Sequence, residues 1–126
     1  MNKLLLGASA LALSAGFSGA AQAEFSLTIL HINDFHSRFE SITGSDSTCN
    51  AEGEQKGECF GGIARLKTAI DAERQKAKAA GENVVLFSAG DDFQGSLFYT
   101  QYKSENVANF MNQIGFDAVA TGNHEF

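Results

Sequence analysis

The sequence predicts an α/β fold with a parallel sheet, and two observations support this prediction. Short apolar runs of strand length alternate with longer stretches whose apolar residues recur every three or four positions. Strands and helices that alternate in this way form parallel strand pairs joined by crossover helices. Each expected strand is also followed by a polar cluster, and ligand sites of open α/β sheets lie at that position.

The first half of the chain is expected to contain one strand and one long loop. Residues 24–32 predict a strand, because β-branched residues such as Ile29 and Ile32 favour extended backbone. Residues 41–61 are rich in Gly, Ser, Asp, Glu and Asn, a composition typical of loops.

The rest of the chain alternates between helix and strand patterns. Residues 62–80 predict an amphipathic helix, and Gly81 follows as a stop signal. Residues 84–87 form a near-continuous apolar run, typical of a strand covered on both faces. The helical spacing returns over residues 107–114, and a last strand is expected over residues 118–120. The apolar stripes of both helices are expected to face the core.

Residues 1–23 are interpreted as a secretory signal peptide. Lys3 gives a short positive start, an apolar run follows, and Ala21-Gln22-Ala23 is a small-x-small cleavage site. A membrane anchor is the alternative, although the run is short for a bilayer span. Cleavage predicts a periplasmic or secreted protein with no stable membrane span.

The net charge argues against two classes of partner. The formal charge of the chain is −6, and loss of Lys3 with the signal peptide makes it −7. An acidic surface repels nucleic-acid phosphates and anionic lipid, so we expect neither as a partner. Acidic side chains can instead bind cations.

The two cysteines, Cys49 and Cys59, are ten positions apart in a polar stretch. In an oxidising compartment we expect a disulfide that closes this loop, worth about 2–3 kcal/mol of loop-closure entropy. Free thiols, or half of a metal site, are the alternatives.

The polar clusters that follow the strands indicate a metal site. Asp34 and His36 follow the first strand, Asp91 follows the second, and Asn123 and His124 follow the third. Parallel strands bring their carboxyl ends to one edge of the sheet, so these groups are expected to lie together. In extended backbone, Asp34 and His36 would point to the same side. Hard oxygen ligands with an imidazole suit Mn, Mg, Zn, Fe or Co.

The ligand chemistry suggests phosphate-ester hydrolysis. Asp34 and His36 can share one ion, and the two oxygens of Asp91 can bridge two ions. Asn123 can offer its carbonyl oxygen to a metal or its amide to a phosphoryl oxygen. A pair of ions activates water and neutralises phosphoryl oxygens. His124 is assigned as general acid or as stabiliser of phosphoryl charge.

Each assigned residue could also be an ordinary turn or loop residue. Three polar clusters that each end a strand are hard to obtain by chance, so the metal site is the favoured interpretation. His31, inside the first strand, is expected to be a core residue or a support for a metal ligand. Asp92, Gln94 and Glu125 are candidates for supporting or loop positions.

Four stretches together resemble the calcineurin-like metallophosphoesterases. More narrowly, they are similar to the secreted 5′-nucleotidase family, which includes bifunctional 2′,3′-cyclic phosphodiesterases. The stretches are ILHINDFHSRFE, GGIARLKTAI, LFSAGDDFQGSLFY and NFMNQIGFDAVATGNHEF. The GDxxQG and GNHE elements in this order are specific, whereas D-x-H alone is a weak signal. The resemblance covers residues 27–126.

The resemblance implies a four-layer α/β/β/α sandwich, with residues 24–126 as its N-terminal portion. It also implies a role for each matching residue: Asp34 and His36 on the first metal, Asp91 bridging both metals, Asn123 on the second metal and the phosphate, and His124 as the catalytic, substrate-binding histidine. The family often carries a disulfide between the first strand and the first helix, which fits Cys49 and Cys59.

By the same resemblance, we expect the chain to be a fragment that is inactive alone. The family continues with further metal ligands and a C-terminal nucleotide-recognition domain. The parent protein would be a 5′-nucleotidase that uses two divalent metal ions in nucleotide catabolism and phosphate scavenging outside the cytoplasm. One alternative is a 2′,3′-cyclic phosphodiesterase, 3′-nucleotidase or other ester hydrolase on the same site. The other is a non-catalytic exported protein that binds metal or nucleotide.

Overall fold

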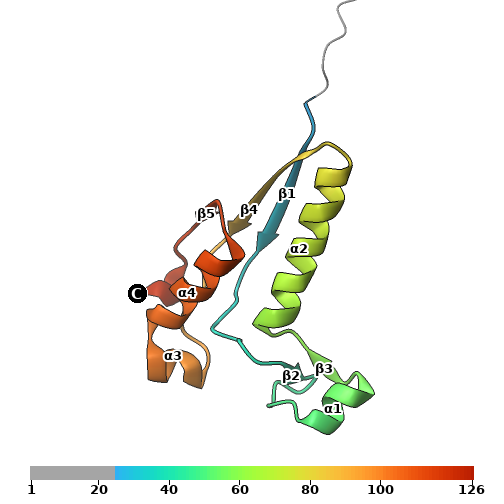
Figure 1. Cartoon of the computed structure of the whole chain (residues 1–126). Helices are drawn as coiled ribbons and strands as arrows, with labels where there is room; N and C mark the ends of the chain where they lie inside the picture. Colours follow the sequence, from blue (N-terminus) through green and yellow to red (C-terminus); the bar gives the residue numbers. More distant parts are fainter. Residues whose placement is uncertain (1–24) are drawn as a thin grey trace, which may run out of the picture.

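The computed structural model describes residues 25–126, and the predicted signal peptide lies outside the described residues. Three strands form its central sheet: β1 (Leu27–Ile32), β4 (Asn83–Ser88) and β5 (Ala118–Val119). They run parallel in the order β1-β4-β5 (Figure 1). The prediction of an α/β fold with parallel strands is therefore confirmed.

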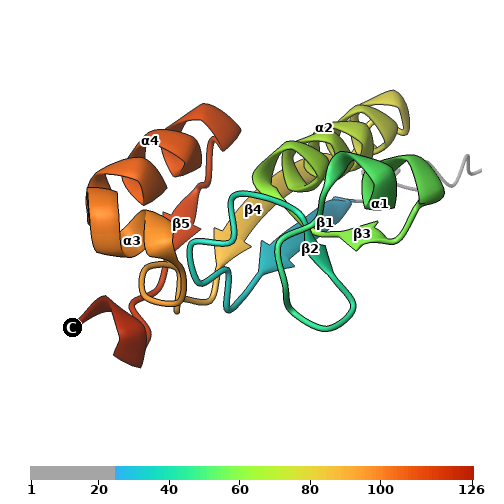
Figure 2. The same cartoon turned by 90° about the horizontal axis from the view of Figure 1, so that it is seen from below.

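Two helices cover one face of this sheet. They are α2 (Ile63–Ala79) and α4 (Ser104–Ile114), and both lie on the same side of the strands (Figure 2). Ile70 of α2, Leu86 of β4 and Ile114 of α4 are buried together and form the core cluster. The predicted apolar stripes therefore do face the core. No helix among residues 25–126 has both the length and the apolar composition needed to cross a membrane.

The opposite face of the sheet is uncovered within the described chain. Leu30 pairs with Leu86, which is 0% exposed, and both lie on the helix-covered face. Ile29 is 56% exposed and Phe87 is 36% exposed, because alternate strand residues point to opposite faces. The expectation that β4 is covered on both faces is thus wrong here. His31 pairs with Phe87 and is also exposed, so its interpretation as a core residue is wrong.

Residues 41–61, predicted as loop, form three short elements instead. They are β2 (Ile42–Thr43), α1 (Ala51–Lys56) and β3 (Cys59–Phe60), with β2 and β3 antiparallel. Two other short elements were also absent from the prediction: α3 (Leu97–Tyr102) and the 3-10 turn η1 (Asn123–Glu125). None of these segments is long enough to show an apolar period, so no periodic signal indicates them.

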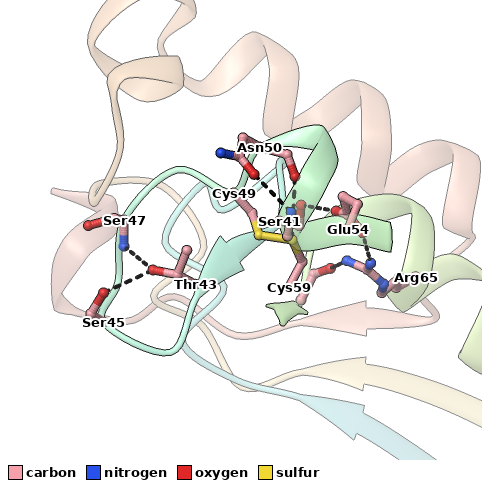
Figure 3. Close-up of a disulfide and its surroundings, with 11 residues drawn as sticks. Ser41, Thr43, Ser45, Ser47, Cys49, Asn50, Glu54, Cys59 and Arg65 are labelled. Atoms are coloured by element: carbon pink, nitrogen blue, oxygen red, sulfur yellow. Dashed lines mark hydrogen bonds and ion pairs between the residues drawn. A yellow bond between two sulfur atoms is a disulfide. The ribbon is translucent and has the colours of Figure 1, made fainter. Parts of the chain in front are cut away.

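The disulfide predicted between Cys49 and Cys59 is present, with the Cα atoms 5.8 Å apart (Figure 3). It joins the residue before the N-cap of α1 to β3. At that N-cap, the Asn50 side chain accepts a hydrogen bond from the Gly53 N–H at 2.8 Å. The covalent link and the cap together explain how a six-residue helix forms in a polar sequence.

Candidate metal centre

The loop that follows β1 is held against the loop that follows β4. The Asp34 N–H donates to the Gly90 carbonyl at 3.0 Å. The His36 N–H donates to the Asp91 carbonyl at 2.9 Å. These bonds continue the pairing of β1 with β4 beyond the ends of the strands, and they place His36 beside Asp91.

The backbone at three of the predicted site residues is left-handed. The φ angles are 53° at Asp34, 50° at His36 and 58° at Asp91. The expectation that Asp34 and His36 share a side because the strand continues is therefore wrong, since β1 ends at Ile32. Their side chains nevertheless meet, with Asp34 Oδ1 3.6 Å from His36 Nε2. Left-handed backbone at non-glycine residues is uncommon and concentrates at functional sites.

A hydrogen bond defines which nitrogen of His36 can bind a metal. Its Nδ1 lies 2.5 Å from the carbonyl oxygen of Gln94. A carbonyl only accepts hydrogen bonds, so Nδ1 carries the proton. In the neutral ring, the lone pair is then on Nε2, the nitrogen that faces Asp34. Ligating histidines are commonly oriented by such a bond to a carbonyl.

His36, Asp91 and His124 converge at the carboxyl ends of the three strands. One potential ligand atom from each lies within 4.8 Å of the others, and the two imidazole centroids are 4.8 Å apart. Two ligand atoms on one ion, each about 2.1 Å from it, lie at most about 4.2 Å apart. Small side-chain movements therefore suffice to bring these donors onto a shared ion.

The η1 turn is tied to Asp91 by its backbone. The His124 N–H donates to Asp91 Oδ1 at 2.9 Å. A Cβ atom built on Gly122 would lie 2.1 Å from the same oxygen, so only glycine fits there without a shift. The hydrogen bond holds one oxygen of Asp91 against the start of η1, and the missing side chain at Gly122 leaves room for it.

Glu125 gathers four backbone N–H groups around its carboxylate. The donors belong to Asp91, Asp92, Phe93 and Gly122. Partial burial alone would raise the pKa of Glu125, but these four donors outweigh it and leave the pKa below its ordinary value. Glu125 is therefore an anion inside the centre, and not a loop residue on the surface.

Asp92 lies beneath the centre and is 1% exposed. Ser88 Oγ donates to its Oδ2 at 2.7 Å, whereas its Oδ1 has no hydrogen-bond partner among the described residues. Burial raises the pKa of Asp92, and the charges of Glu125 and Asp91 act in the same direction. Asp92 is therefore a buried carboxyl group with one oxygen that has no partner among the described residues, next to the carboxylates of Asp91 and Glu125.

The remaining predicted residues lie at the rim. Asp34 and Asn123 are both exposed, Asp34 beside His36 and Asn123 as the first residue of η1. Asn33 is one of the polar residues that follow the first strand, but neither it nor Ser37 is assigned a role from the sequence. The Asn33 amide donates to Asp34 Oδ2 at 2.6 Å, and the Ser37 hydroxyl, fully buried, donates to the Phe93 carbonyl. Adjacency to Asp34 and His36 was the only signal for either residue.

The donor set fits a divalent cation. Imidazole nitrogen and carboxylate oxygen are ligands of Zn, Mn, Fe and Co. The buried carboxyl group of Asp92 lies behind them. His124, expected to act on substrate, is part of the same cluster as His36 and Asp91. Its imidazole could therefore face either a metal or a phosphoryl group.

Known proteins share this sequence and fold. The family model described as calcineurin-like phosphoesterase matches residues 27–126. Human 5′-nucleotidase is 47% identical over 117 residues, which are 92% of this chain and 19% of that protein. Snake venom 5′-nucleotidase of Naja atra is 42% identical over 102 residues, which are 81% of this chain and 18% of that protein. The chain thus spans about a fifth of the length of the curated relatives it matches.

Solved structures give the same result. A 5′-nucleotidase precursor from Thermus thermophilus has a TM-score of 0.60 and 32% identity, over 81% of this chain and 18% of that one. A Thermus thermophilus sulfate thiohydrolase has a TM-score of 0.63 at 15% identity, over 82% of this chain and 26% of that one, and so shares the fold alone. With the family model matching every residue from the start of β1 to Phe126, the chain belongs to the calcineurin-like phosphoesterase family.

Proposed function

We propose that this chain is the N-terminal portion of a metal-dependent phosphohydrolase that cleaves nucleotide phosphate monoesters. The observation that carries this proposal is the convergence of His36, Asp91 and His124 at the carboxyl ends of three parallel strands. Relatives named 5′-nucleotidase at 47% and 42% identity support nucleotides as the substrate class. Because this chain spans about a fifth of those proteins, the activity is proposed for the full-length protein.

Each donor has a part in the proposed site. His36 would bind one ion through Nε2, with Asp34 beside it, and Asp91 would bridge two ions. Asn123 would reach the second ion and the phosphate. When bound, the ions supply Lewis acidity and activate water. Asp91 keeps one oxygen on the His124 N–H, so its other oxygen and remaining lone pairs are available to metal.

The side chains that face solvent form a surface suited to a phosphate group. A hollow beside the centre is lined by Asp34, His36, Arg38, Gln94, Gly95 and His124. The cationic Arg38 guanidinium is paired with Asp46 at 3.0 Å, and His124 would be the proton donor to the leaving alcohol or a hydrogen-bond donor to the phosphoryl oxygens. Gly95 lets the backbone pass close to His36, since a Cβ atom there would lie 2.5 Å from His36 Cβ.

We further propose that the protein is exported, with residues 1–23 as its signal peptide. The Cys49–Cys59 disulfide supports an oxidising compartment, periplasmic or extracellular. One of the relatives is a snake venom protein, which also fits export.

Phosphate release from AMP by the full-length protein tests the proposal. We expect a chelator to abolish turnover and added Mn²⁺ or Zn²⁺ to restore it. His124→Ala should lower kcat by about 10²–10⁴-fold, the usual contribution of a proton donor. Lys78→Ala, at an exposed residue in the last turn of α2, is the matched control and should leave kcat unchanged. Turnover that survives complete metal removal would contradict the proposal.

A further inference from the structure

We propose that Glu125 is a positioning residue for the metal centre, and that it acts by holding the backbone on which Asp91 is mounted. This inference rests on the proposed function. Glu125 is not one of the proposed metal or substrate ligands. Its carboxylate instead contacts the loop that carries the bridging ligand Asp91.

The contacts of Glu125 are divided evenly between its two oxygens. Oε2 accepts from the Asp91 N–H at 3.0 Å and from the Gly122 N–H. Oε1 accepts from the Asp92 N–H at 2.5 Å and from the Phe93 N–H at 3.2 Å. Three successive N–H groups that converge in this way form an anion-binding concavity. The anion bound in it here is the protein's own carboxylate.

This arrangement excludes two other roles for Glu125. An ionised carboxylate has about four lone-pair sites, and four N–H donors occupy them. No lone pair of Glu125 is left to bind a metal ion, and none is left to accept a proton in acid–base catalysis. Glu125 therefore influences the centre through Asp91, by geometry.

Asp91 needs such a restraint because its backbone is left-handed, with a φ of 58°. Its carbonyl accepts the His36 N–H at 2.9 Å, and its own N–H is held by Glu125 at 3.0 Å. Its carboxylate accepts the His124 N–H at 2.9 Å. The loops after β4 and β5 are thus joined by reciprocal bonds, a carboxylate from each loop accepting backbone N–H groups of the other.

Glu125→Gln is the informative substitution, because it keeps the size of the side chain and replaces one acceptor oxygen with an NH₂ donor. That donor would face two N–H groups that already point at it. The loop would shift, and Asp91 would lose its alignment with His36 and His124. We expect metal affinity to fall by about 10–100-fold, the usual effect of losing a group that orients a ligand.

The experiment is a calorimetric titration of the metal-free full-length protein with Mn²⁺, for the parent and three variants. Glu125→Gln and Glu125→Asp test the inference, the second by shortening the side chain while keeping its charge. Glu105→Gln is the matched control, since Glu105 is an exposed carboxylate in the first turn of α4. Both Glu125 variants should bind Mn²⁺ more weakly, and Glu105→Gln should bind as the parent does. Activity of the Glu125 variants should recover at saturating metal.

A further variant separates positioning from general loss of stability. Ile114→Val trims a core residue that is 3% exposed and lowers the melting temperature without touching the centre. If Ile114→Val weakens Mn²⁺ binding as much as Glu125→Gln does, the inference is overturned. It is also overturned if both Glu125 variants bind Mn²⁺ like the parent, and the proposed function then stands. A parent protein that binds no Mn²⁺ would overturn the proposed function together with the inference.

Discussion

Substituting Gly122 by alanine is expected to damage the metal centre through steric contacts with Asp91. The backbone at Gly122 has a φ of −91° and a ψ of −170°, an extended conformation that any residue adopts. Alanine therefore causes no backbone strain, and the effect must come from the new methyl group. That group would lie 2.1 Å from Asp91 Oδ1 and 2.7 Å from the Asp91 backbone nitrogen.

The magnitude follows from these contacts. An ordinary carbon–oxygen contact is more than 1 Å longer than the 2.1 Å found here, so the Asp91 carboxylate must move by roughly that amount. Overpacking of this kind costs about 1–3 kcal/mol. The movement also breaks the bond from the His124 N–H to a charged acceptor, worth about 1.5–3 kcal/mol. We expect a total loss of about 2.5–6 kcal/mol in unfolding free energy, together with weaker metal binding.

Urea denaturation and Mn²⁺ titration of the full-length protein measure the two effects. Gly44→Ala is the matched control, because its Cβ would meet only Phe60, at 3.8 Å, and its φ is not left-handed. A double variant, Gly122→Ala with Asp91→Ala, removes the oxygen that the methyl group meets. Only the 2.7 Å contact with the backbone nitrogen of residue 91 then remains, so the stability cost of Gly122→Ala should be smaller in the Asp91→Ala background.

A Gly122→Ala variant that matched Gly44→Ala in both stability and metal affinity would contradict this prediction. An equal stability cost of Gly122→Ala with and without the Asp91 side chain would contradict it too. In that case the contact with the carboxylate would not be the cause.

Two other predictions concern the segment from β2 to α2. Replacing Cys49 and Cys59 together by serine should lower the unfolding free energy by about 2–3 kcal/mol in urea titrations, because the disulfide no longer restrains the unfolded chain. Mn²⁺ affinity should stay unchanged. A double variant as stable as the parent would contradict this prediction. Glu54 has a lowered pKa because it accepts a hydrogen bond from Ser41 and lies beside Arg65. Its contribution to stability is therefore present above the pKa of the unfolded carboxyl group and is lost as the pH falls through the pKa of the folded state. Glu54→Gln should therefore lower the melting temperature at neutral pH but not in acid, and a pH-independent difference would show that the carboxylate charge is not responsible.

The central sheet and its helices could be predicted because each element has a clear apolar pattern. Residues 84–87 are apolar throughout, and β4 spans Asn83–Ser88. The spacing of Ile63 and Ile70 indicated α2, whose bounds differ from the prediction by one residue at each end. By contrast, α1 and α3 have six residues each and no buried residue, so no apolar periodicity indicates them in the sequence.

The sequence could not tell which face of the sheet is covered. Leu30 and Ile29 are both apolar, yet only Leu30 packs against the helices. His31 shows the same limit: its place in the strand was predictable, but its exposed environment depends on what packs against β1. Register and helix placement decide burial, and neither is encoded in a single strand.

The candidate site could be located from sequence, but not its internal geometry. The polar clusters after β1, β4 and β5 meet because parallel strands end at one edge of a sheet. The reason given for Asp34 and His36 was wrong, since left-handed backbone, not an extended strand, brings their side chains together. Glu125 was expected at a supporting or loop position, but its four backbone N–H donors could not be predicted, because they converge only once two loops are placed.

Diffraction from crystals of the full-length protein grown with Zn²⁺, measured on both sides of the zinc absorption edge, tests the central claim most directly. We expect an anomalous peak coordinated by His36 Nε2, a carboxylate oxygen of Asp91 and the neighbouring Asp34, at about 2.0–2.2 Å from its ligand atoms. Zinc bound only elsewhere, with these three side chains making no contact to it, would contradict it.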